Sequence, residues 1–117
     1  MKHTVSLKQN HEFRRLYNKG MTAASPWIAV YCRKNRLGIS RLGLTTGVKL
    51  GNAVRRNRVR RRLREIYRTN EDRLRPGMDI VVVARVRAVH SHYGELERSF
   101  LQLARKLDLL VPGEDRK

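Results

Sequence analysis

Residues 51–68 constrain what this chain can fold into more than any other part of the sequence. The stretch holds eight arginines and one acid. Its apolar residues Val59, Leu63 and Ile66 recur at positions i, i+4 and i+7, which is the spacing of one helical face. An asparagine suited to N-capping opens the stretch. The pattern therefore predicts a helix over residues 52–70, with one narrow apolar stripe packed on a sheet.

The arginines of this helix gather on the faces beside the stripe. Four of them follow one another at i+4 spacing: Arg56, Arg60, Arg64 and Arg68. Like charges one turn apart destabilise a helix by a few tenths of a kcal/mol each, so this ridge costs on the order of 1 kcal/mol. Because the planar guanidinium fork binds phosphate oxygens bidentately, the pattern favours a phosphate-binding surface. A merely solvated charged face is the alternative.

The charge balance of the whole chain points the same way. Lys and Arg number 27 against 10 Asp and Glu, for a net charge of +17 over 117 residues. Self-repulsion of that size opposes compactness unless a polyanion neutralises it, and nucleic acid or an anionic membrane surface would do so. The longest apolar run, residues 80–84, is far shorter than the roughly 20 residues of a membrane span, and the N-terminus lacks the apolar stretch of a signal peptide. We therefore expect a soluble protein without a membrane partner.

Cysteine and acid usage argue against a self-sufficient enzyme. The single cysteine, Cys32, allows no internal disulfide, which fits a reducing cytoplasm. It alternates with Ile28 and Val30, so we interpret it as a small core residue rather than a reactive thiol. The four histidines lack partners at metal-ligand spacing, and the ten acids form no cluster of the kind that two-metal hydrolysis needs. We therefore expect neither a metal site nor a catalytic residue in the protein.

Hydrophobic periodicity predicts one α/β domain of two layers over residues 1–117, in the order α-β-β-β-α-β-α. The expected elements are a helix over 7–19, strands over 22–24, 27–33 and 41–46, the arginine-rich helix, a strand over 79–85 and a helix over 91–107. The run at 79–85 is almost wholly apolar, so this strand should be covered on both faces. Order is expected from about residue 5 to residue 110, with a flexible tail over 111–117.

Aromatic side chains offer a second possible contact with nucleic acid. The candidates for a platform on which unpaired bases could stack are Phe13, Tyr17, Trp27 and Tyr31. Proteins that hold single-stranded nucleic acid commonly use such rings, although each ring taken alone is more often part of a core. Tyr31 is the strongest candidate, because it shares a strand face with Arg33.

The surroundings of the arginine-rich helix favour RNA over DNA. A DNA reader would carry a helix-turn-helix pair or a dimerising zipper, and neither is indicated around residues 51–68. On the residues alone two other classes stay open. One is a ribosomal-type protein that binds ribosomal RNA, and the other is a nucleoid-type binder of duplex DNA.

A long motif surrounds the start of the arginine-rich helix. Its residues are Lys49-Leu50-Gly51-Asn52-Ala53-Val54, followed by Arg56-Asn57-Arg58, Arg60-Arg61 and Arg64-Glu65. The motif resembles the signature of the protein subunit of bacterial ribonuclease P. Segments 7–20, 41–45 and 79–85 are similar to the family's first helix and to the strands that flank the motif.

This resemblance implies a mixed four-stranded sheet like that of domain 2 of ribosomal protein S5, with a left-handed βαβ crossover around the arginine-rich helix. It implies that the chain is an accessory subunit of ribonuclease P, the endoribonuclease that removes the 5′ leader of precursor tRNA. The catalytic groups and most of the Mg²⁺ would belong to the RNA subunit. The implied partners are that catalytic RNA and precursor tRNA, with no obligate protein partner.

The resemblance also assigns roles to residues. With the other arginines of the helix added, the positions expected to bind the catalytic RNA are Arg55, Arg56, Asn57, Arg58, Arg60, Arg61, Arg62, Arg64 and Arg68. The positions expected to line the cleft for the single-stranded leader are Phe13, Tyr17, Tyr31, Arg33 and Lys49. Arg55, Arg60 and Arg62 make the helix richer in arginine than the family pattern, so we expect tighter and less selective electrostatic binding.

Overall fold

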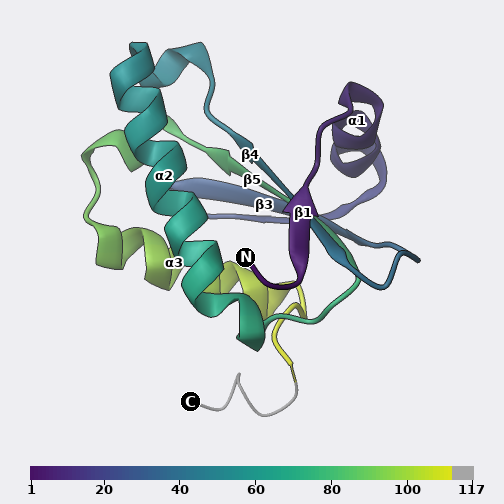
Figure 1. Cartoon of the computed structure of the whole chain (residues 1–117). Helices are drawn as coiled ribbons and strands as arrows, with labels where there is room; N and C mark the ends of the chain where they lie inside the picture. The colour runs from purple at the N-terminus through teal and green to yellow at the C-terminus, as the bar shows by residue number, and fades with distance from the viewer. Residues whose placement is uncertain (112–117) are drawn as a thin grey trace.

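The computed structural model of the chain describes residues 1–111 as one sheet with helices on both faces (Figure 1). The strands are β1 (Thr4–Ser6), β2 (Met21–Ala24), β3 (Ile28–Lys34), β4 (Ser40–Thr45) and β5 (Met78–Ala84). The α-helices are α1 (Asn10–Lys19), α2 (Ala53–Asn70) and α3 (Tyr93–Lys106). Short 3₁₀ helices lie in the connections: η1 (Val48–Leu50), η2 (Glu71–Arg73) and η3 (Val86–His90).

The sheet is mixed, in the strand order β1-β4-β5-β3-β2. β4 runs parallel to β5, with Leu42 opposite Ile80, and β1 runs parallel to β4. β3 is antiparallel to both of its neighbours, β5 and β2. Because adjacent parallel strands cannot be joined by a tight turn, the chain crosses from β4 to β5 through α2. This confirms the expected βαβ unit around the arginine-rich helix, while the left hand of its crossover stays a prediction.

Both faces of β5 are buried, as its apolar run predicts. Ile80, Val81 and Val82 are each at most 2% exposed. Ile80 and Val82 face the main core, which α2 and α3 cover, whereas Val81 packs with Leu16 in a smaller core beneath α1. In Figure 1, α2 and α3 accordingly lie on one side of the sheet and α1 on the other. Cys32 is buried in the main core, where burial raises the pKa of its thiol to about 11, which confirms it as a core residue.

Two expectations for the N-terminal part are wrong. The sheet has five strands rather than four, because residues 4–6 pair with β4 as an additional strand. The first helix begins at Asn10 instead of residue 7, after a capping box formed by Gln9 and Glu12. A three-residue strand is too short to show a period of two. Its pairing partner Ser40 is also distant in sequence.

The other predicted helices and strands are confirmed to within two residues at each end. Of the tail that was expected to be flexible, only Val111 is described, and its N–H donates to the backbone oxygen of Arg73 at 2.8 Å. The remaining tail residues, 112–117, lie outside the described residues. Over residues 1–111, no helix is long and apolar enough to span a bilayer.

A buried carboxylate holds β1 in place. Glu71, at the end of α2, is only 7% exposed. It accepts hydrogen bonds from the backbone N–H groups of Lys2 at 2.8 Å and His3 at 3.1 Å, and from the Thr4 hydroxyl at 2.5 Å. Burial raises the pKa of Glu71, but these hydrogen bonds outweigh burial and hold the pKa below its ordinary value of 4.5. Glu71 therefore ties the N-terminal residues to the end of α2.

We expect Glu71→Gln to destabilise the fold by about 1.5–3 kcal/mol, the range for a hydrogen bond to a charged group. An amide offers one oxygen where the carboxylate offers two. Because folding lowers the pKa of Glu71, its contribution is complete above pH 4.5 and is lost as the pH falls through the folded-state value.

Urea unfolding at neutral and at strongly acidic pH measures this effect. The control is Asp72→Asn, because Asp72 is exposed and its nearest ion-pair contact, with His3, spans 3.7 Å. It should change the free energy of unfolding by less than about 0.5 kcal/mol. Equal losses from the two substitutions at neutral pH would contradict the role given to Glu71.

Candidate nucleic-acid interface

Helix α2 lies on the sheet through the narrow stripe that its sequence predicts. Val59, Leu63 and Ile66 are each at most 3% exposed. Asn52 is the N-cap, and its side-chain oxygen accepts the backbone N–H of Arg55 at 3.0 Å. The predicted start and apolar stripe of the helix are thus confirmed, and its arginines lie on the remaining faces.

Three arginines of α2 are oriented by hydrogen bonds to uncharged oxygens. Arg56 donates to the backbone oxygen of Thr46 at 3.0 Å, and Arg60 donates to the side-chain oxygen of the same residue at 2.7 Å. Arg62 donates to the backbone oxygen of Ser91 at 3.1 Å. None of these acceptors is an anion. The directions of the three guanidinium groups are therefore fixed without a carboxylate that would compensate their positive charge.

The other residues expected to bind the catalytic RNA are exposed: Arg55, Asn57, Arg58, Arg61, Arg64 and Arg68. Arg68 differs from the rest, because its guanidinium donates two hydrogen bonds to Glu65, at 2.9 and 2.5 Å. Among the described residues, no acid forms an ion pair with the earlier arginines of the helix. We refer to the arginines of residues 55–64 as the arginine face of α2.

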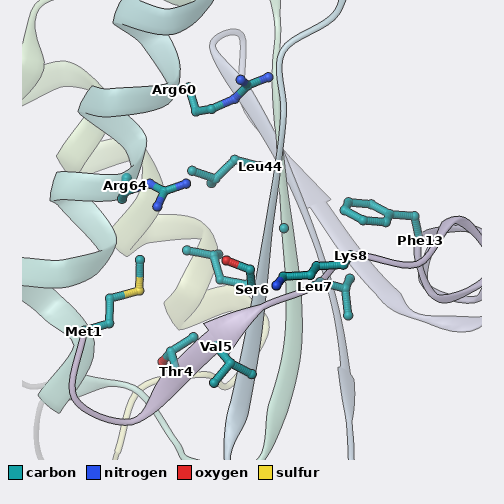
Figure 2. A pocket seen from close by; sticks show the side chains of 12 residues that line it. Met1, Thr4, Val5, Ser6, Leu7, Lys8, Phe13, Leu44, Arg60 and Arg64 are labelled. Atoms are coloured by element: carbon teal, nitrogen blue, oxygen red, sulfur yellow. The ribbon is translucent and has the colours of Figure 1, made fainter.

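A groove runs along β4 between α1 and α2. It consists of two adjoining hollows, of about 650 and 800 Å³, whose linings share Phe13, Leu44 and Arg60. Tyr17 lines the smaller hollow, while Arg64 and the strand β1 line the larger one. Figure 2 shows the larger hollow, with Arg60 and Arg64 extending from α2 and Phe13 on the side of α1. We refer to the two hollows together as the β4 groove.

Two of the aromatic candidates, Phe13 and Tyr17, line this groove, and Tyr31 packs against Tyr17 next to it. The ring centroids of Phe13 and Tyr17 are 6.5 Å apart, and those of Tyr17 and Tyr31 are 4.9 Å apart in an edge-to-face arrangement. The Tyr17 hydroxyl lies 3.2 Å from the side-chain oxygen of Thr45, and Tyr17 is 39% exposed. Although the rings come from α1 and β3, they form one cluster on the α1 face of the sheet.

The remaining candidates lie outside this cluster. Arg33 is exposed on β3, two residues from Tyr31 and therefore on the same face. Lys49 is exposed in η1, just before α2. Trp27 does not line the groove, because it packs against the main core beneath the guanidinium of Arg87.

A network of ion pairs, which the sequence patterns did not indicate, fixes α1 on the sheet. Arg41 of β4 donates to both carboxylate oxygens of Asp79 on β5, at 2.8 and 2.7 Å, and also pairs with Glu12 of α1. Asn35 donates to Asp79 at 2.9 Å. Burial raises the pKa of Asp79, but the hydrogen bonds from Arg41 and Asn35 outweigh burial, so the pKa lies below its ordinary value. The only sequence signal is one charged residue inside each of two largely apolar strands.

Comparison with known proteins identifies the family. The sequence profile of the family described as Ribonuclease P matches residues 1–108. The chain belongs to the ribonuclease P protein family. It is 41% identical over 110 residues to the ribonuclease P protein component of Natranaerobius thermophilus, covering 94% of this chain and 96% of that protein. It is 35% identical over 109 residues to the ribonuclease P protein component of Clostridioides difficile, covering 92% and 96%.

Solved structures agree with this assignment. The RNase P protein of Staphylococcus aureus superposes with a TM-score of 0.80 at 30% identity, covering 91% of this chain and 97% of that one. The RNase P protein from Thermotoga maritima gives a TM-score of 0.77 at 30% identity, covering 86% and 96%. The expected resemblance and the mixed α/β fold class are confirmed. The chain is therefore a subunit of ribonuclease P, the holoenzyme that processes the 5′ ends of tRNA, rather than a ribosomal-type or nucleoid-type protein.

The close approach of α1 to β4 can be tested at Gly43. A Cβ at this position would lie 2.6 Å from two atoms of the Phe13 ring and 3.3 Å from a methyl group of Val81. We expect Gly43→Ala to displace the ring and to destabilise the fold by about 1–2 kcal/mol, within the range for overpacking. Urea unfolding measures the change.

The control is Gly47→Ala, because nothing lies within 4 Å of a Cβ at that position. This substitution should change the free energy of unfolding by less than about 0.5 kcal/mol. If the two alanine variants were equally stable, the Phe13 ring could not lie directly over β4.

Proposed function

We propose that this subunit binds RNA on two adjoining surfaces. The arginine face of α2 binds the catalytic RNA of ribonuclease P, and the β4 groove binds the single-stranded 5′ leader of precursor tRNA. The observation that carries the proposal is the position of Arg60, which belongs to the arginine face and lines both hollows of the groove. One small domain can therefore contact the catalytic RNA and the leader side by side.

The charge and orientation of the arginine face support binding to a folded RNA. Hydrogen bonds to Thr46 and Ser91 already restrict three of the guanidinium groups. These side chains therefore lose less conformational entropy when they bind phosphate. The residues that we propose for this contact are Arg55, Arg56, Asn57, Arg58, Arg60, Arg61, Arg62 and Arg64. Arg68 belongs to the same surface but contributes less, because Glu65 already neutralises it.

The aromatic cluster supports binding of unpaired bases. Every base has a π-face, so stacking on Phe13, Tyr17 and Tyr31 tolerates differences in sequence, as leaders of different tRNAs require. The exposed cations Arg33 and Lys49 would bind phosphates of the same strand. Apolar rings beside basic side chains are the combination by which proteins hold single-stranded nucleic acid.

We propose that bond breaking takes place on the RNA subunit. Within residues 1–111, no group of three or more His, Cys, Asp and Glu side chains is placed to hold a metal ion. Glu12 and Asp79 share Arg41, which leaves them unsuited as metal ligands. These residues do not fit a Mg²⁺ site, so we propose that the RNA holds Mg²⁺ and supplies the catalytic groups. The protein positions the leader and neutralises phosphate charge.

The cellular setting follows from the same chemistry. A single thiol that is buried suits a reducing compartment, and we propose that the complex works in the cytoplasm, where precursor tRNA is made.

Reconstitution tests the proposal as a whole. With a bacterial ribonuclease P RNA at low Mg²⁺, adding the protein should accelerate cleavage of precursor tRNA at least about tenfold. The reason is that the arginine and lysine side chains of the bound protein replace part of the counterion atmosphere of the RNA. The protein without RNA should cleave nothing. The absence of any gain in rate, or cleavage by the isolated protein, would contradict the proposal.

The role of the aromatic cluster beside the groove predicts a loss of binding that depends on the leader. Tyr31→Ala should weaken binding of precursor tRNA to the holoenzyme roughly 5- to 100-fold, since stacking contributes about 1–3 kcal/mol per base. Binding of mature tRNA should change much less. Titration of the holoenzyme with each RNA gives the two Kd values.

The matched control is Tyr93→Ala, because Tyr93 is 37% exposed on α3 and, unlike Tyr31, makes no ring contact with the aromatic cluster. Thermal unfolding checks that both variants are folded. A comparable loss for mature tRNA, or a comparable loss in the Tyr93 variant, would exclude a leader-specific role for the aromatic cluster.

A further inference from the structure

One end of the sheet carries a basic surface that, apart from Lys49, has no role in the groove or in the arginine face. It is the end at which α2 begins, where the β2–β3 turn, η1 and η3 come together. We refer to this surface as the Trp27 face, and its residues are Trp27, Val48, Lys49, Arg85, Val86 and Arg87.

Backbone and side-chain contacts join these segments into one surface. The N–H of Arg85 donates to the backbone oxygen of Trp27 at 2.9 Å, and its guanidinium donates to the backbone oxygen of Ser25, also at 2.9 Å. These bonds tie η3 to the β2–β3 turn. η1 contacts η3, and both contact α2, so the Trp27 face continues into the arginine face of α2. In Figure 1 the segment after β5 accordingly runs beside α2 on its way to α3.

Arg87 is held in place by an aromatic ring. Its guanidinium carbon lies 5.7 Å from the centroid of the Trp27 ring, within the range of a cation–π contact. Trp27 packs against the main core, so the guanidinium covers the side of the indole that the core leaves free. An arginine supported in this way is already ordered, and its outer face and N–H groups remain available to a ligand.

The charge of the Trp27 face is uncompensated within the described residues. No carboxylate among residues 1–111 forms an ion pair with Lys49, Arg85 or Arg87. Apolar side chains are exposed beside these cations, since Val48 is 77% exposed and Val86 is 52% exposed. Cations for phosphate next to a flat or apolar surface for a base are what an unpaired nucleotide needs.

We propose that the Trp27 face binds an unpaired nucleotide of the catalytic RNA, which stacks on the guanidinium plane of Arg87. Stacking of an RNA base on the plane of an arginine guanidinium is a known way in which proteins recognise bases in loops and bulges. The catalytic RNA is the favoured occupant because the Trp27 face continues into the arginine face of α2. In that respect the inference rests on the proposed function of α2.

The test compares single substitutions by the Kd for assembly of the protein with a bacterial ribonuclease P RNA. Arg87→Ala should weaken assembly roughly 5- to 30-fold, in the range found for loss of one stacked base. Arg87→Lys keeps the charge but loses the planar group, so it should recover less than half of that loss on a logarithmic scale. Arg105→Ala, an exposed arginine of α3, is the charge-matched control and should stay within about twofold of the parent protein.

Chemical probing of the RNA locates the contact. One or a few unpaired nucleotides should be protected by the parent protein and by Arg105→Ala, and exposed again with Arg87→Ala. Full recovery by Arg87→Lys would show a simple charge effect and would overturn the stacking. A weaker affinity of the assembled holoenzyme for precursor tRNA, with subunit assembly unchanged, would also overturn the assignment.

Arg60→Ala separates failure of this inference from failure of the proposed function. If Arg60→Ala weakens assembly and Arg87→Ala does not, the arginine face of α2 binds the RNA and the Trp27 face does not. If neither substitution changes the Kd beyond the Arg105→Ala control, both the inference and the RNA-binding role of α2 are wrong.

Discussion

The narrow contact between α2 and the sheet is the constraint on which the rest of the structure depends. A helix of 18 residues that carries eight arginines is held by side chains such as Val59, Leu63 and Ile66. Full burial of one such side chain contributes roughly 1.5–3 kcal/mol, more than the roughly 1 kcal/mol that repulsion along the arginine ridge costs. The sheet can therefore present a surface of one sign of charge that the isolated helix could not sustain.

The parallel pairing of β4 and β5 determines where the groove lies. The crossover through α2 covers one face of the sheet, α1 covers the opposite face, and β4 lies between them near the edge. Side chains from the two helices therefore approach each other across β4, Arg60 from one side and Phe13 from the other. Gly43 permits this approach because a larger residue would meet the Phe13 ring. The basic and aromatic contacts thus adjoin as a consequence of strand order.

Local patterns in the sequence were sufficient wherever one element buries one face. The helix over 52–70, the doubly buried strand over 79–85 and the burial of Cys32 all followed from spacing. Strand β1 could not be predicted, because three residues carry no period and their partner strand is distant in sequence. The pairing of Arg41 with Asp79 depends on strand register, and the meeting of Tyr17 with Tyr31 depends on how α1 packs on the sheet; no local pattern contains either of them. The RNA contacts of individual residues stay predictions.

The uneven distribution of acidic residues along α2 gives the molecule an electric dipole. Glu65, Glu71 and Asp72 lie at the end of α2, whereas residues 53–64 of the same helix include no acid. A protein with such a dipole is turned by the field of a polyanion before contact, so encounters with the wrong face forward become less frequent. The carboxylate that ties down the N-terminus thus lies at the less basic end of α2, and orientation during diffusion depends in part on a side chain that also stabilises the fold.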